Sequence, residues 1–114
     1  MAERTTHEEY VAMQRRRVAN LAQQILSQEI DVLDGSSQIA DLRYELKVDD
    51  NDDDLMAFQL IQSETDALPI GAEAQNWSEE ALARKEPELR RAREWAFKMV
   101  REECERLISR FSDA

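Results

Sequence analysis

The residues best suited to bind a ligand are six consecutive acidic or amide side chains, Asp-Asp-Asn-Asp-Asp-Asp at positions 49–54. Their oxygens suit calcium, but an EF-hand loop also needs a glycine at its sixth position and a glutamate at its twelfth. Counted from Asp49, those positions hold Asp54 and Leu60, and counting from Asp50 fits no better. We therefore expect a loop whose last aspartates cap the following helix and complement its dipole. A weak adventitious cation site is the alternative.

Residues for nucleophilic or metal-assisted catalysis are scarce. The only histidine, His7, lies near the N-terminus, where a Ser-His-Asp or Cys-His arrangement would have to use it. The sequence has no zinc spacing, glycine-rich phosphate loop or dinucleotide fingerprint. The glutamates within 102–105 resemble those that hold magnesium in helical pyrophosphohydrolases, but neighbouring arginines such as Arg106 favour ion pairs within the helix. We predict no catalytic residue, no metal site and no cofactor.

The net charge of −10 arises in one part of the chain. Residues 1–48 carry six basic and eight acidic side chains, and residues 81–114 carry nine basic and seven acidic ones. Residues 49–80 carry ten acidic side chains and no basic one. Such a field repels nucleic acid and anionic membranes and attracts basic surfaces. The basic residues within 84–93 are diluted by glutamates, so we predict no nucleic-acid partner and no membrane partner.

The sequence also bears on the cellular compartment. No apolar run approaches the roughly 18 residues that a membrane span requires, and residues 1–9 lack the apolar centre of a signal peptide. The single cysteine, Cys104, cannot form an internal disulfide, and we expect it to be buried and unreactive on an apolar helix face. These features favour a cytoplasmic protein.

The elements that must position these residues are predicted to be helices in one domain, 1–114. Thr6 to Glu9 form a capping box that begins a helix ending near Ser27. A turn at Asp34–Gly35 should precede a second helix capped by Ser36 or Ser37 and reaching Leu46. A short third helix is expected over residues 55–61, although a strand is possible there.

The last element organises the others. Apolar residues recur every three or four positions between Ser78 and Phe111, which predicts a long amphipathic helix capped by Ser78. Pro87 either kinks this helix or divides it, and two segments nearly in line are favoured. The predicted fold is all-α, a small four- to five-helix bundle packed around a long, Pro-kinked C-terminal helix.

Two features of the predicted bundle stay open. Arg15 falls on or beside the apolar face of the first helix, where its side chain either extends to solvent or pairs with a carboxylate. A stretch without clear periodicity runs from Gln62 to Trp77 and is long enough to be functional. Within it, Glu64 and Asp66 either face solvent or reach Arg15. Satisfying its own backbone is the simpler role of this stretch.

Part of the chain resembles a known group of proteins. The segment Ser-Glu-Thr-Asp-Ala-Leu-Pro-Ile-Gly at 63–71, followed by Trp77 and the segment 81–88, is similar to small uncharacterised bacterial all-helical proteins, some of which resemble toxin-immunity proteins. The resemblance covers residues 20–111. An aspartate often precedes the serine in that group, where this chain has Gln62. The resemblance implies an all-helical fold in a bacterial cytosol and no catalytic residues.

The leading functional hypothesis is an acidic protein-binding module, an immunity protein that neutralises a cognate bacterial toxin by covering its basic surface or cleft. The partner would be a basic protein. The alternatives are a metal-dependent nucleotide hydrolase that uses clustered Asp and Glu residues, and a structural helical homodimer. The candidate partner-binding residues are Asp52, Asp53, Asp54, Glu64, Asp66, Glu73, Trp77 and Glu79.

Overall fold

The first helix, α1 (His7–Leu26), begins where its capping sequence predicts. The Thr6 hydroxyl accepts a hydrogen bond from the Glu9 amide at 3.1 Å, and the Glu9 carboxylate accepts one from the Thr6 amide at 3.2 Å. This capping box provides partners for amides that the helix leaves free. The helix ends at Leu26, next to Ser27, where the sequence predicts its end. The computed structural model describes residues 6–114, so the prediction about a signal peptide falls partly outside the described residues.

The second helix, α2 (Val32–Leu42), begins earlier than the sequence predicts. The expected turn at Asp34–Gly35 is wrong, because both residues lie inside the helix. Asp31 takes the capping role that was assigned to a serine, since its side chain accepts a hydrogen bond from the Leu33 amide at 2.8 Å. An aspartate at this position satisfies a free amide and complements the helix dipole.

Gly35 serves close helix packing rather than a turn. A Cβ at this position would lie 2.7 Å from Cγ1 of Ile25, so the absence of a side chain lets α2 approach α1. The predicted second helix is also too long at its C-terminal end. A 3₁₀ helix, η1 (Arg43–Glu45), follows α2, and Lys47 then adopts a positive φ of 55° that ends the helical run.

The third helix, α3 (Asp53–Glu64), confirms the prediction of a helix and excludes the strand. The Asp52 carboxylate accepts a hydrogen bond from the Asp54 amide at 3.0 Å, which confirms that an aspartate of the acidic run caps this helix. At the other end, the buried Thr65 hydroxyl donates to the Ile61 carbonyl at 2.6 Å. The turn thus satisfies part of its own backbone, as predicted.

The irregular stretch predicted between Gln62 and Trp77 is shorter than expected. Its first residues belong to α3, and a second 3₁₀ helix, η2 (Gly71–Asn76), occupies its end. Gln62 itself joins two helices, because its amide nitrogen lies 2.8 Å from a carboxylate oxygen of Asp41 and 3.1 Å from the Ser37 hydroxyl on α2. An aspartate at this position could not donate these hydrogen bonds.

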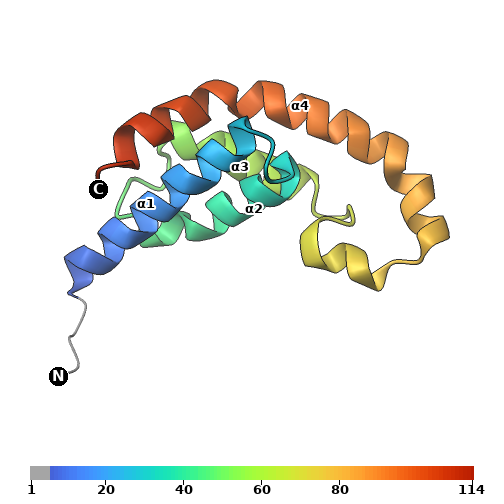
Figure 1. The fold of residues 1–114 in the computed structure, drawn as a ribbon, viewed down its shortest axis with the longest axis horizontal. Coiled ribbons are helices and arrows are strands. Elements are labelled where there is room, and N and C mark those ends of the chain that lie inside the picture. Colours follow the sequence, from blue (N-terminus) through green and yellow to red (C-terminus); the bar gives the residue numbers. More distant parts are fainter. Residues whose placement is uncertain (1–5) are drawn as a thin grey trace.

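The last helix, α4 (Glu79–Phe111), is continuous, so the favoured division into two segments is wrong. The Ser78 hydroxyl accepts a hydrogen bond from the Ala81 amide at 3.1 Å, as predicted for the cap. Pro87 lies inside the helix and has no N–H to donate to the Ala83 carbonyl. Figure 1 shows that the helix changes direction near its N-terminal end, as a proline within a helix can cause.

The arrangement of the helices confirms the predicted all-α fold, and residues 6–114 contain no strand. Figure 1 shows α4 as an arch over the other three α-helices, with η2 and the first turns of α4 projecting beyond them. The radius of gyration of 15.4 Å exceeds the value of about 13 Å expected for a compact chain of this length, in agreement with that projection. Within residues 6–114, no helix is both long and apolar enough to cross a membrane. The core draws on all four α-helices and includes the fully buried Val18, Leu33, Phe58, Val100 and Leu107.

Arg15 has a different role from either of the two predicted ones. Its Nε donates to the Leu46 carbonyl at 2.9 Å and its Nη2 to the Lys47 carbonyl at 3.4 Å. The guanidinium carbon also lies 5.5 Å from the centroid of the Phe111 ring. Arg15 therefore connects α1 with the segment that leads into the acidic loop and with the end of α4.

Candidate functional site

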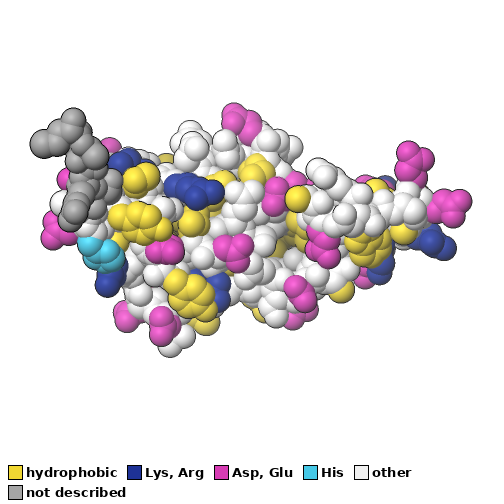
Figure 2. Space-filling view, turned by 90° about the horizontal axis from the view of Figure 1, so that it is seen from below, with side chains coloured by type: hydrophobic (Ala, Val, Ile, Leu, Met, Phe, Trp, Pro, Cys, Tyr) yellow, Lys and Arg dark blue, Asp and Glu magenta, His cyan; other side chains and the backbone are white. Residues whose placement is uncertain are grey.

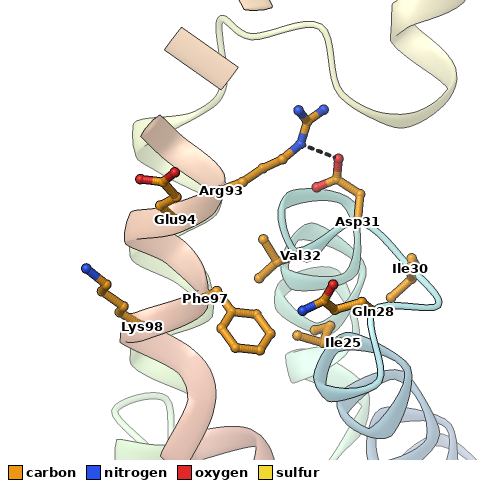
Figure 3. A pocket seen from close by; sticks show the side chains of 9 residues that line it. All are labelled: Ile25, Gln28, Ile30, Asp31, Val32, Arg93, Glu94, Phe97 and Lys98. Atoms are coloured by element: carbon orange, nitrogen blue, oxygen red, sulfur yellow. Dashed lines mark hydrogen bonds and ion pairs between the residues drawn. The ribbon is translucent and has the colours of Figure 1, made fainter. Parts of the chain in front are cut away.

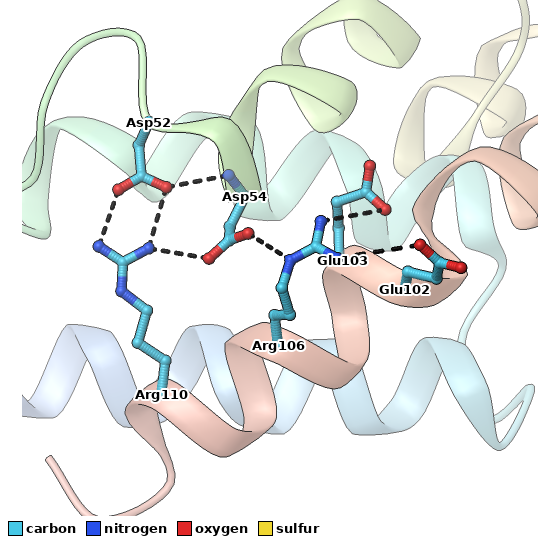
Figure 4. A network of polar contacts seen from close by, with 6 residues as sticks. All are labelled: Asp52, Asp54, Glu102, Glu103, Arg106 and Arg110. Atoms are coloured by element: carbon cyan, nitrogen blue, oxygen red, sulfur yellow. Dashed lines mark hydrogen bonds and ion pairs between the residues drawn. The ribbon is translucent and has the colours of Figure 1, made fainter.

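The acidic loop is joined to α4 by a cluster of ion pairs, which we call the Asp–Arg clamp (Asp52, Asp54, Arg106 and Arg110; Figure 4). Arg110 donates to both carboxylate oxygens of Asp52, at 2.9 and 2.7 Å, and to Asp54 at 3.0 Å. Arg106 donates through Nε to the other oxygen of Asp54 at 2.6 Å. The bidentate contact is the geometry in which arginine binds a carboxylate most strongly.

The carboxylates of the clamp are largely buried, whereas its arginines reach solvent. The side chains of Asp52 and Asp54 are 11% and 16% exposed, and those of Arg110 and Arg106 are 36% and 50% exposed. The hydrogen bond from Arg110 lowers the pKa of Asp52, partly opposed by burial of the carboxylate. The hydrogen bond to Asp52 raises the pKa of Arg110, and the one to Asp54 raises the pKa of Arg106. The hydrogen bonds from these arginines to Asp52 and Asp54 fasten the start of α3 to α4.

The other acidic residues of this loop are exposed to solvent. Asp49, Asp50 and Asp53 are exposed, and none forms an ion pair with a described lysine or arginine. They line an open polar hollow of about 560 Å³ together with Asn51 and Asp52. Because the clamp connects this loop to α4, the backbone that carries these three carboxylates is restrained.

The remaining predicted partner-binding residues lie elsewhere on the molecule. Glu64 and Asp66 are exposed at the C-terminal end of α3 and form no ion pair with a described cation, Arg15 included. Glu73 lies on η2, Trp77 is half-buried between η2 and α4, and Glu79 begins α4.

The eight predicted residues therefore lie at the two ends of α3 and on the projecting part formed by η2 and the start of α4, and they do not gather in one patch (Figure 1). On the face shown in Figure 2, carboxylates are likewise dispersed along the length of the protein. The segment without cations folds into two separate acidic regions near α3, one at each end of that helix, and a third on the projecting part.

Metal binding finds little support in the geometry. Among the described residues, no three or more His, Cys, Asp or Glu side chains come together as ligands for a metal ion. The least exposed carboxylates of the acidic loop, Asp52 and Asp54, already bind arginine. In α4, Nη1 of Arg106 lies 3.9 Å from Oε2 of Glu102, and Nη2 lies 3.7 Å from Oε1 of Glu103. The ion pairs predicted within this helix are therefore confirmed for Arg106.

A groove of about 450 Å³ between α4 and the junction of α1 with α2 is a feature that the sequence does not reveal (Figure 3). Ile25, Val32 and the Phe97 ring form its apolar part. Arg93 on α4 crosses one end and donates to Asp31 at 2.8 Å. These two residues are 62 positions apart, so no local pattern could have linked them.

Cys104 is fully buried, as predicted, and does not form part of any site. Burial raises the pKa of its thiol to about 12, with smaller contributions from Glu103 and Glu105. A thiol in such surroundings is a poor nucleophile, because the thiolate is the reactive form.

Comparison with protein-family models, curated proteins and solved structures finds no significant match to this chain. The resemblance to toxin-immunity proteins therefore stays a prediction. A functional assignment has to be argued from the geometry and charge of the described residues.

Proposed function

We propose that this chain is a protein-binding module that recognises a basic protein. The supporting observation is that Asp49, Asp50 and Asp53 remain exposed and unpaired with described cations, although two neighbouring aspartates are bound by arginines. An acidic surface of this kind accelerates association with a positively charged partner and discriminates against acidic ones. A loop that the Asp–Arg clamp already restrains also loses little conformational entropy when it binds.

The finer proposal is an immunity protein that acts in a bacterial cytoplasm. Toxins that attack nucleic acids or nucleotides have basic clefts, and aspartates that stand in for phosphates can cover such a cleft. The open hollow lined by residues 49–53 could receive a lysine or arginine side chain of the toxin. The resemblance of segment 63–71 to small bacterial helical proteins, some of which resemble immunity proteins, motivates this proposal.

The test must separate loss of charge from loss of fold. We would capture partners from the bacterial host, purify them, and compare two variants of equal net charge. One variant carries Asp49→Asn, Asp50→Asn and Asp53→Asn. The control carries substitutions of three exposed glutamates outside the acidic loop, Glu8→Gln, Glu29→Gln and Glu105→Gln.

We expect a basic partner whose association with the loop variant is slower by about tenfold and less dependent on salt, while the control changes by less than about twofold. Co-expression of the chain should also suppress the toxicity of that partner in bacteria. The proposal fails if no basic protein is retained at about 0.15 M salt, or if both variants associate at the same rate.

A further inference from the structure

The solvent side of α3 exposes apolar side chains that the fold leaves uncovered. Met56 is 49% exposed and Leu60 is 44% exposed, four positions apart on one helix face. The opposite side of α3 supplies Leu55, Phe58 and Ile61 to the core, so the helix is apolar on two faces. A helix that is apolar on its outer side as well indicates an additional contact.

Acidic residues bracket this apolar pair on the same face. Asp53 precedes Met56 by three positions, and Glu64 follows Leu60 by four, so all four side chains fall in one stripe of the helix. We call these residues the α3 stripe. Asp53 and Glu64 are eleven positions apart, which corresponds to about 16 Å along the helix axis. Both carboxylates are exposed and unpaired with described cations.

The stripe leads into a hollow that holds an exposed tryptophan. Glu64 and Trp95 line the same hollow of about 450 Å³ between the end of α3 and α4. Trp95 is 36% exposed, and tryptophan is the residue most enriched among those that dominate binding energies. The rim carries Arg91 and the ion pair of Lys85 with Glu88 at 3.1 Å, so the apolar contact lies inside a polar border, as in other protein interfaces.

We propose that the α3 stripe and the Trp95 hollow form the docking surface for an amphipathic helix of the basic partner, an inference that rests on the proposed function. Charge complementarity identifies the occupant. It carries lysines or arginines about eleven positions apart, which reach Asp53 and Glu64, and apolar side chains between them, which cover Met56 and Leu60. One further apolar side chain enters the hollow beside Trp95.

Synthetic helical peptides of about 18 residues test the surface directly. The probe peptide has two lysines eleven positions apart and two leucines between them on the same face. A second peptide replaces the leucines with serine. Binding is followed by tryptophan fluorescence in a Trp77→Phe background, which leaves Trp95 as the only reporter.

The variant Met56→Ser/Leu60→Ser removes the apolar pair and keeps the charge. Its matched control, Met13→Ser/Tyr44→Ser, removes two exposed apolar side chains from other elements, 46% and 74% exposed. We expect the probe peptide to bind the parent at about 0.15 M salt, with affinity about tenfold lower in the α3 variant and less than about twofold lower in the control. The serine peptide should bind at least about tenfold more weakly than the probe. Far-ultraviolet circular dichroism verifies that each variant is folded.

Equal affinity of parent and α3 variant, or no binding of the probe peptide, overturns the docking surface. If peptide binding is lost instead in an Asp49→Asn/Asp50→Asn variant, which keeps Asp53 of the α3 stripe, the docking surface is wrong and the proposed function stands. If the parent is a dimer in sedimentation equilibrium and the Met56→Ser/Leu60→Ser variant is a monomer, a second copy occupies the stripe and the inference is overturned. Capture of a basic partner tests the proposed function separately.

Discussion

The substitution Arg110→Gln tests whether the Asp–Arg clamp holds α3 against α4. Arg110 makes three hydrogen bonds to two carboxylates, and the side chain of Asp52 is 11% exposed. Hydrogen bonds to charged groups contribute about 1.5–3 kcal/mol when buried, but the 36% exposure of Arg110 allows solvent to screen them. We therefore expect the free energy of unfolding to fall by about 1–2 kcal/mol.

Substitutions of Asp52 separate the ion pair from the helix cap. Asparagine caps a helix about as well as aspartate, so Asp52→Asn loses the charge and should cost about 1 kcal/mol. Alanine loses the cap as well, so Asp52→Ala should cost about 1 kcal/mol more. In the double variant Asp52→Asn/Arg110→Gln, the loss of unfolding free energy should be about 1 kcal/mol smaller than the sum of the two single losses, because both substitutions remove the same contact.

Urea unfolding followed by circular dichroism at neutral pH measures these differences. Arg101→Gln is the control, since Arg101 is exposed on the same helix and pairs with no described carboxylate. Its free energy of unfolding should stay within about 0.5 kcal/mol of the parent value. The reasoning is refuted if Arg110→Gln lowers the free energy of unfolding no more than Arg101→Gln does, or if the loss in the double variant equals the sum of the two single losses.

Three further predictions follow from the described geometry. Arg110 lowers the pKa of Asp52 below its ordinary value of 3.8, so the stability that the pair provides is present above about pH 4 and is lost as the pH falls through the lower folded pKa. The difference in unfolding free energy between the parent and Asp52→Asn, measured in urea at several pH values, should therefore shrink as the pH falls below about 4. Gly35→Ala should lower the free energy of unfolding by about 1–2 kcal/mol despite the better helix propensity of alanine, because the new Cβ meets Ile25; a thermal unfolding midpoint equal to or above that of the parent would contradict this. Cys104 should react with a thiol reagent only upon unfolding, since it is fully buried and its pKa is about 12; rapid labelling of the native protein would show the burial to be wrong.

The helix starts that the sequence predicts correctly depend on local chemistry. The caps at Thr6 and Ser78 each bind an amide three residues further on, so a short window of sequence contains both partners. An aspartate cap for α3 is also predicted correctly, although the helix begins two residues before the expected position 55. The long apolar periodicity before Phe111 is equally local, because it reflects one face of one helix. These signals were enough for the fold class.

The boundaries that the sequence predicts wrongly depend on distant contacts. Asp34–Gly35 has the composition of a turn, yet both residues lie inside α2, and glycine is needed there because Ile25 of α1 leaves no room for a side chain. Pro87 favours a break, yet α4 continues through it, and buried residues such as Leu89 hold the following turns against the core. Local propensity is a weak guide wherever tertiary packing opposes it.

The same limit applies to the charge count on which the functional hypothesis depends. A sequence without cations between residues 49 and 80 suggests that every carboxylate in it is available to a partner. The structure divides them, because Asp52 and Asp54 bind arginines more than fifty positions away while Asp49, Asp50 and Asp53 do not. Neutralising Asp52 to Asp54 as a block would therefore loosen α3 and reduce binding for a reason unrelated to docking. A decisive test of recognition has to leave the Asp–Arg clamp intact. Only carboxylates that pair with no arginine of the same chain should be counted as candidates for binding a partner.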